Sequence, residues 1–364
     1  MKTPLQGEVF FLYAFDVADE IRTDKAEKIL AKKKAVPSGP SNERLVPKVI
    51  PFYRPLTIDP HHDSWRIEDR PVQTLVRIYD VGVVSVLISV PFEAGDLKEL
   101  LRFHRPILDN KIPLDKAAHE LSRNVVDNLR EYLVSASEVN ITEAYTVFVL
   151  RQLGQDGSAE RWAEDQRREI AGLLAETDPA MLSQQQIDET FRHKLSFESD
   201  DVVIVDWDAA LVVDLAGDIE DEIHVLELAN LQLEELVLMD KRLDVYLNRA
   251  YEELEQSRTK LFSLKRNEIK KLRRFRMDVA KITDEVSNIS KFFGDWYLAR
   301  IYLAARDRFH LATWRESIQN RILHLDNLYE TLHGEANEAR MLFLEAMIVL
   351  LFIIDLVAVF WLKR

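Results

Sequence analysis

The chain contains no cysteine among its 364 residues. Disulfide bonds, thiolate metal sites and thiol nucleophiles are therefore excluded. Basic residues are also in deficit, because 62 Asp and Glu against 48 Lys and Arg give a formal net charge of -14. This acidity argues against a general nucleic-acid-binding surface unless the basic residues are segregated.

The second half of the chain has almost no residues that break helices. All 12 prolines occur at or before Pro179, and after Gly172 the only glycines are Gly217, Gly294 and Gly334. This half is expected to form long helices that end near those three glycines. The first half, where prolines and glycines gather, is expected to be mixed α/β. The predicted fold is therefore α+β, with a mixed α/β domain at 1–215, a long helical coiled-coil region at 217–333 and a terminal helix at 335–364.

Periodicity within the first domain predicts its elements. The clearest is a β-hairpin with β-branched arms at 72–78 and 83–90, a turn at 79–82, and Pro91 ending the second arm. The other expected elements are an aromatic strand at 8–15, helices at 17–31, 96–104, 114–134 and from 159, strands at 142–153, 201–205 and 209–213, and a flexible loop near 32–47.

A heptad seam marks the helical region, where apolar residues recur at alternating steps of three and four. The seam consists of Leu272, Phe275, Val279, Ile282, Val286, Ile289, Phe293 and Trp296. The same spacing occurs upstream at Leu243, Leu247 and Ala250, and downstream at Ile318, Ile322 and Leu325. Pairing within one chain and pairing between chains in an oligomeric bundle both satisfy this pattern.

A basic cluster lies between residues 260 and 281, where nine Lys and Arg stand against two acids. Its basic face consists of Lys265, Arg266, Lys270, Lys271, Arg273, Arg274 and Arg276. We favour pairing of this face with the stretch 218–235, which holds seven acids and no Lys or Arg. The alternative is a polyanion, either RNA or anionic lipid headgroups.

The end of the chain is apolar from Met341 onward. Up to residue 362 its only charged residues are Glu345 and Asp355, and Trp361 stands where an interfacial aromatic belongs. The length matches the roughly 20 residues that cross a bilayer, so a single C-terminal transmembrane anchor is predicted, with Asp355 facing a partner helix or water. No export signal precedes it, so the bulk of the chain is expected in the cytoplasm behind the inner (cytoplasmic) membrane, or in the matrix behind the mitochondrial inner membrane.

The sequence has no motif for catalysis or cofactor binding. It lacks a phosphate-binding loop, a dinucleotide glycine pattern, a nucleophile elbow and a zincin motif. His61, His62 and Asp63 have no second element at metal-ligand spacing. We therefore expect a protein that is not an enzyme and binds neither cofactor nor metal.

Four short motifs occur in a suggestive order. They are Tyr-Asp-Val-Gly-Val-Val at 79–84, Leu-Glu-Leu at 226–228, Lys-Arg-Leu-Asp at 241–244, and Leu-Glu at 344–345 before the terminal apolar run. This order resembles the required-for-meiotic-nuclear-division family. The resemblance implies a membrane-tethered, oligomeric, non-catalytic protein, with mitochondrial relatives in the inner membrane that support mitochondrial translation.

The expected function is a membrane-anchored homo-oligomeric scaffold or tether whose α/β head binds a protein partner. One alternative is a subunit of a CorA-like cation channel or transporter, which shares the order of α/β head, stalk helices and C-terminal span. The other is a membrane-bound RNA-binding factor that uses the basic face.

Overall fold

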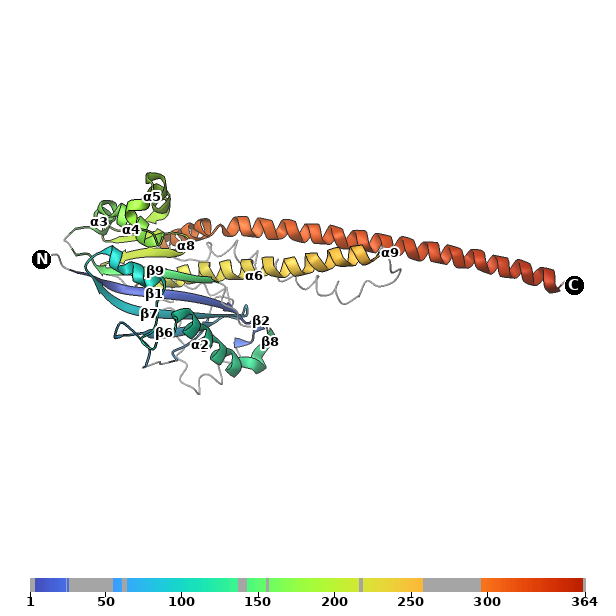
Figure 1. Cartoon of the computed structure of the whole chain (residues 1–364), viewed down its shortest axis with the longest axis horizontal. Helices are drawn as coiled ribbons and strands as arrows, with labels where there is room; N and C mark the ends of the chain where they lie inside the picture. The colour runs from blue at the N-terminus through green and yellow to red at the C-terminus, as the bar shows by residue number, and fades with distance from the viewer. Residues whose placement is uncertain are drawn as a thin grey trace. The chain divides into compact units, whose positions relative to one another are not determined.

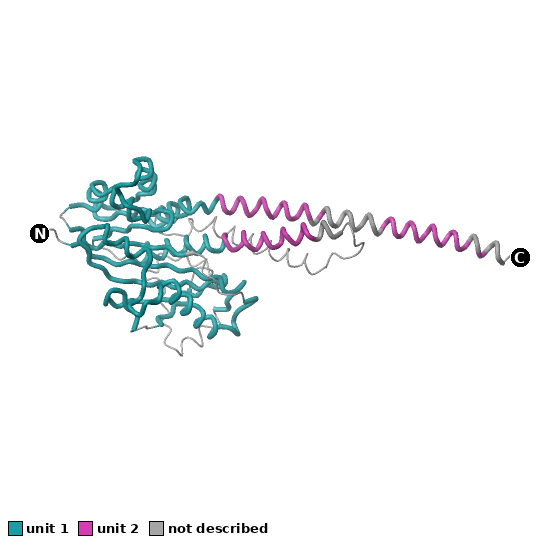
Figure 2. Tube along the Cα trace, in the orientation of Figure 1, with its two compact units in different colours: residues 1–236, 286–312 teal, residues 237–285, 313–364 magenta. Residues whose placement is uncertain are grey.

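The computed structural model describes residues 4–23, 25, 55–60, 64–136, 143–154, 157–215, 219–257 and 296–362. They form a mixed α/β protein with one large sheet and several helices (Figure 1). The chain divides into two compact units (Figure 2): unit 1 comprises residues 1–236 and 286–312, and unit 2 comprises residues 237–285 and 313–364.

An eight-stranded sheet forms the centre of unit 1, in the order β10-β11-β12-β9-β1-β7-β6-β3. Its strands are β1 (Leu5–Asp16), β3 (Leu56–Ile58), β6 (Gln73–Ile78), β7 (Val83–Ala94), β9 (Glu143–Gln152), β10 (Lys194–Leu195), β11 (Asp201–Val205) and β12 (Ala209–Asp214). Neighbouring strands are antiparallel except β9 and β12, which are parallel. Two small sheets pair β2 (Ala18–Ile21) with β8 (Leu133–Ala136), and β4 (Arg66–Ile67) with β5 (Arg70–Pro71).

The central sheet is buried on both faces. Successive side chains of a strand point to opposite faces, so Phe11 and Phe15 share one face of β1 and Leu12 and Ala14 share the other. All four side chains are at most 2% exposed. A strand covered on both sides has no polar face, which explains why residues 8–15 alternate only weakly.

Short helices cover the first face of the sheet. They are the 3-10 helices η3 (Leu97–His104), η4 (Arg130–Tyr132), η5 (Pro179–Met181) and η6 (Phe191–His193), and the α-helices α2 (Leu114–Leu129), α3 (Ala159–Asp165), α4 (Arg167–Leu174) and α5 (Gln184–Thr190). Leu100, Leu121 and Trp162 from this layer share one hydrophobic core with Phe11 and Phe15. Side chains of Asp96, Ser158 and Ser183 accept hydrogen bonds from backbone N–H groups at the starts of η3, α3 and α5, which satisfies donors that a helix leaves free.

Two longer helices meet the second face. They are α6 (Glu220–Ser257), through its residues in unit 1, and α8 (Trp296–Arg308). Arg77 of β6 binds Glu227 of α6, and the ring of Tyr145 in β9 lies 5.0 Å from that of Phe309, the residue after α8. The sheet is therefore the middle layer of unit 1.

Most predicted elements of unit 1 are confirmed, with three corrections. The hairpin is present, but β7 continues through Pro91, which lies opposite Glu8 of β1. Proline is tolerated there because β6 pairs with β7 only as far as Ser89, so β7 has no β6 residue to pair with at Pro91.

The two other corrections concern helices. The helix predicted at 17–31 is wrong at its start, since β2 pairs with β8 there, and the helix predicted at 114–134 ends at Leu129. The loop predicted near 32–47 lies outside the described residues.

Gly82 closes the turn between β6 and β7 with φ +94°, a conformation that favours glycine. A Cβ added there would lie 1.9 Å from the backbone oxygen of Ala18, which cannot be accommodated without moving β2. We expect Gly82→Ala to lower the free energy of unfolding by about 1–3 kcal/mol or more, measured by urea denaturation followed by circular dichroism. The control is Gly95→Ala, whose Cβ would meet only the end of the Glu99 side chain at 3.1 Å. Equal losses in the two variants would contradict this account of Gly82.

The described part of unit 2 consists of the end of α6 and most of α9 (Leu311–Leu362). The two helices run side by side and in parallel (Figure 1), because Arg321 binds Asp240 and Asp244 while His324 Nε2 lies 2.8 Å from the Tyr251 hydroxyl. The flanking seam residues are at most 9% exposed, namely Leu243, Leu247 and Ala250 of α6 and Ile318, Ile322 and Leu325 of α9. This part of the heptad pattern is therefore buried within one chain.

The predicted transmembrane anchor is wrong. Across the described residues, no helix is both long enough and apolar enough to cross a membrane. Met341, Glu345, Asp355 and Trp361 instead belong to the last part of α9, a single helix of 52 residues. The predicted single-pass membrane location is therefore wrong as well. The apolar run is the continuation of the heptad-patterned helix α9 and not a separate segment.

Candidate interaction site

Two buried ion-pair clusters hold unit 1 together, and the first joins the sheet to α6. Arg77 donates to Oε2 of Glu227, whose side chain is 2% exposed, and His224 Nδ1 lies 3.4 Å from the same oxygen. Burial alone would raise the pKa of Glu227, but the charge of Arg77 and the hydrogen bond with His224 outweigh it and hold the pKa at about 2. The carboxylate is therefore ionised and held by its neighbours.

The second cluster lies at the turn between β11 and β12. Asp206 accepts hydrogen bonds from Arg308 Nε at 2.8 Å and from the Thr190 hydroxyl at 2.7 Å. Arg308 Nη1 also donates to Glu189 at 3.1 Å, and the Tyr145 hydroxyl donates to the Asp206 backbone oxygen at 3.0 Å. Because these groups bind one another, the cluster fastens α8 to the turn and offers no free reactive group.

The surface beside this turn carries two perturbed groups. Burial and the charge of Asp206 raise the pKa of Asp208, while burial lowers the pKa of His104, whose Nε2 lies 2.7 Å from the Leu173 backbone oxygen. Neither group is hydrogen-bonded to a nucleophile in the part of the chain that is described. Over the same part, no three His, Asp or Glu side chains are grouped to hold a metal ion.

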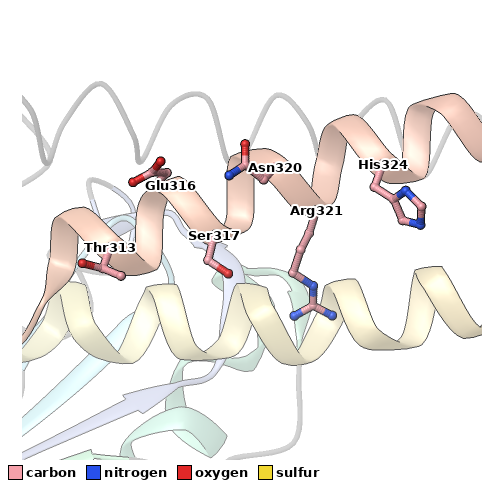
Figure 3. Close-up of a pocket in the computed structure, with 6 residues that line it drawn as sticks. All are labelled: Thr313, Glu316, Ser317, Asn320, Arg321 and His324. Atoms are coloured by element: carbon pink, nitrogen blue, oxygen red, sulfur yellow. The ribbon is translucent and has the colours of Figure 1, made fainter.

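A shallow polar groove follows one face of α9 in unit 2 (Figure 3). Its lining residues recur at helical spacing and are Thr313, Glu316, Ser317, Asn320, Arg321 and His324. Figure 3 shows Arg321 pointing toward α6, where Asp240 and Asp244 bind it. Because two carboxylates already neutralise this cation, the groove is not suited to bind an anionic ligand.

The apolar segment, defined as residues 341–354 of α9, is the longest run of exposed large apolar side chains among the described residues. Its twelve large apolar side chains are between 42% and 71% exposed, and they are Met341, Leu342, Phe343, Leu344, Met347, Ile348, Val349, Leu350, Leu351, Phe352, Ile353 and Ile354. Folded chains rarely leave a contiguous apolar surface of this extent uncovered unless it is an interaction site. The apolar segment is therefore the candidate site.

The structure places few of the other residues singled out by sequence. The basic face at Lys265, Arg266, Lys270, Lys271, Arg273, Arg274 and Arg276, and the seam at Leu272, Phe275, Val279, Ile282, Val286, Ile289 and Phe293, lie outside the described residues. Trp296, the last seam residue, is described and is an exposed residue at the start of α8.

Sequence reasoning missed both ion-pair clusters. A weak signal was present for the first cluster, because Arg77 stands between Val76 and Ile78 and Glu227 lies in an apolar stretch of helix. A lone charge in such a setting is rarely buried without a partner. The partner itself could not be named, since 150 residues separate Arg77 from Glu227.

Comparisons with known proteins correct the family prediction. The family described as "Uncharacterized protein MJ0711, N-terminal domain" matches residues 6–220, more than half of the chain. Uncharacterized protein MJ0711 of Methanocaldococcus jannaschii is 20% identical over 292 residues, which cover 80% of this chain and 83% of that protein. No solved structure matches the chain. The predicted membership of the required-for-meiotic-nuclear-division family is wrong, because it was based on motifs of two to six residues that many unrelated chains share. The chain belongs to the family of the MJ0711 N-terminal domain.

Proposed function

We propose that the protein is a non-catalytic scaffold that acts as a homo-oligomer. In this proposal unit 1 is the head that binds a protein partner, and α9 is the element that assembles the copies. The observation that carries the proposal is the exposed apolar segment 341–354.

The size of the apolar segment supports self-association. Burying a fully exposed large apolar side chain contributes about 1.5–3 kcal/mol, and these side chains are about half exposed, so covering all twelve would contribute on the order of 10–20 kcal/mol. Association costs about 4–15 kcal/mol in lost translational and rotational freedom. Covering most of the apolar segment therefore supplies a free energy of the size that association requires.

The buried ion pairs of unit 1 support a non-catalytic role for this unit. Two of its buried carboxylates are paired with arginines, Asp206 with Arg308 and Glu227 with Arg77. Catalytic groups need to meet a substrate, whereas groups sealed in such pairs stabilise packing.

Sedimentation velocity of the purified full chain tests the proposal. We expect a species of two or more copies, at two or more times 42.3 kDa, that persists in a mild non-ionic detergent which disperses non-specific aggregates. Leu350→Ser should weaken the assembly, while Leu323→Ser should not, although both leucines are exposed residues of α9. A species that stays at 42.3 kDa across the micromolar range would contradict the proposal.

A further inference from the structure

The heptad repeat of α9 continues far beyond the part that α6 covers. Apolar residues follow one another at unbroken steps of four and three. They are Ile318, Ile322, Leu325, Tyr329, Leu332, Ala336, Ala339, Phe343, Ala346, Leu350 and Ile353. The sequence of α9 therefore carries one unbroken heptad repeat, called the seam here.

The two ends of this seam differ in burial. Ile318, Ile322 and Leu325 are at most 8% exposed, whereas Phe343, Leu350 and Ile353 are 52% to 56% exposed. The same kind of side chain in the same helical position is thus covered at the start of the seam and uncovered near its end.

The described part of α6 lies beside the buried end of the seam. Tyr251 contacts His324, and the described part of α6 runs six residues further, to Ser257. In a parallel pair Ser257 is at the level of about residue 330, at about 1.5 Å per residue. Phe343 lies about 20 Å further along α9, beyond the part that the described residues of α6 cover.

We propose that a second copy of this chain covers the exposed end of the seam. The α9 helices of two copies pack against each other along Phe343, Ala346, Leu350 and Ile353, in parallel, as α6 and α9 already do in the covered part. This inference rests on the proposed homo-oligomeric function and adds the face of the helix that makes the contact.

The positions of the two acids favour this face over the others. At about 100° per residue, Glu345 and Asp355 lie more than 100° from the centre of the seam. Pairing along the seam leaves both carboxylates in solvent. Pairing along the opposite side, which includes Ile348 and Phe352, would bring the like charges of two copies together at a desolvated contact.

Because the chain contains no cysteine, one substitution introduces a single thiol. A disulfide requires Cα atoms within about 4.4–6.8 Å, so only residues that face each other across the pair can be linked. We expect oxidised Leu350→Cys to run as a covalent dimer on a non-reducing gel and to return to the monomer with dithiothreitol. The matched control is Ile348→Cys, which is as exposed on the same helix but lies off the seam, and it should stay monomeric.

Charge substitutions give an independent test. Leu350→Glu should raise the dissociation constant of the assembly by about 100-fold or more, and Ile348→Glu by less than about threefold. Equal cross-linking at the two positions, or an unchanged dissociation constant in Leu350→Glu, would contradict pairing along the seam. Either result would still be compatible with a homo-oligomeric scaffold. A chain that never associates would overturn both the seam and the proposed function.

Discussion

Replacing Arg77 with methionine is expected to lower the free energy of unfolding by about 3–5 kcal/mol. The substitution keeps an unbranched apolar stem but leaves the carboxylate of Glu227 buried without its guanidinium partner. Urea denaturation at pH 7 measures the loss, and hydrogen exchange in α6 locates it. In the double variant Arg77→Met/Glu227→Leu most of the stability should return, because the buried charge is removed as well. If the double variant is as unstable as the single one, the loss comes from packing and not from charge.

The pH dependence provides a second signature of the same pair. The pKa of Glu227 is about 2 in the folded protein and 4.5 for an unperturbed glutamate, so its stabilising contribution is complete above pH 4.5 and is lost as the pH falls toward 2. Without Arg77 the same burial raises the pKa of Glu227, and protonation then relieves the strain. The stability difference between the wild type and Arg77→Met should therefore shrink by about 3 kcal/mol on acidification. A difference that is constant between pH 7 and pH 3 would argue against an ionised Glu227.

Short-range sequence patterns correctly predicted the elements whose conformation depends on residues close in the sequence. The strands predicted at 201–205 and 209–213 follow from consecutive β-branched residues on either side of a short turn, and the structure has both, the second extending to Asp214. The stretch after Val17 was expected to be helical, but Ala18–Ile21 forms a strand because it pairs with residues 133–136, more than 100 positions away. A single sequence shows no such pairing, and pairing decides the conformation of short segments.

The apolar segment shows a different limit of sequence reasoning. Its composition was evident, and the run from Met341 was interpreted as a membrane span because hydrophobicity and length are the properties that composition reveals. The heptad register that links it to Ile318 and Leu325 was equally present in the sequence. What the sequence could not show is which residues of the seam lie against α6, since that depends on the direction and register of α6 beside α9.

The cluster at the β11–β12 turn leads to the second large prediction. Asp206→Ala should lower the free energy of unfolding by about 3–5 kcal/mol, because Arg308, whose side chain is only 13% exposed, loses its main counter-charge. The Thr190 hydroxyl and the Trp207 backbone N–H lose their acceptor in the same substitution. Thermal unfolding followed by circular dichroism measures the loss.

Glu189→Gln is the matched control for the Asp206 substitution, since Glu189 also binds Arg308 but its side chain is 43% exposed. A solvent-exposed ion pair contributes about 0–1 kcal/mol, so this variant should unfold almost as the wild type does. The contrast tests whether burial, and not the mere presence of a carboxylate, sets the strength of the cluster. If the two variants lose equal stability, then Arg308 is held by solvent-screened charges and α8 is fastened to the sheet by apolar contacts such as that between Tyr145 and Phe309.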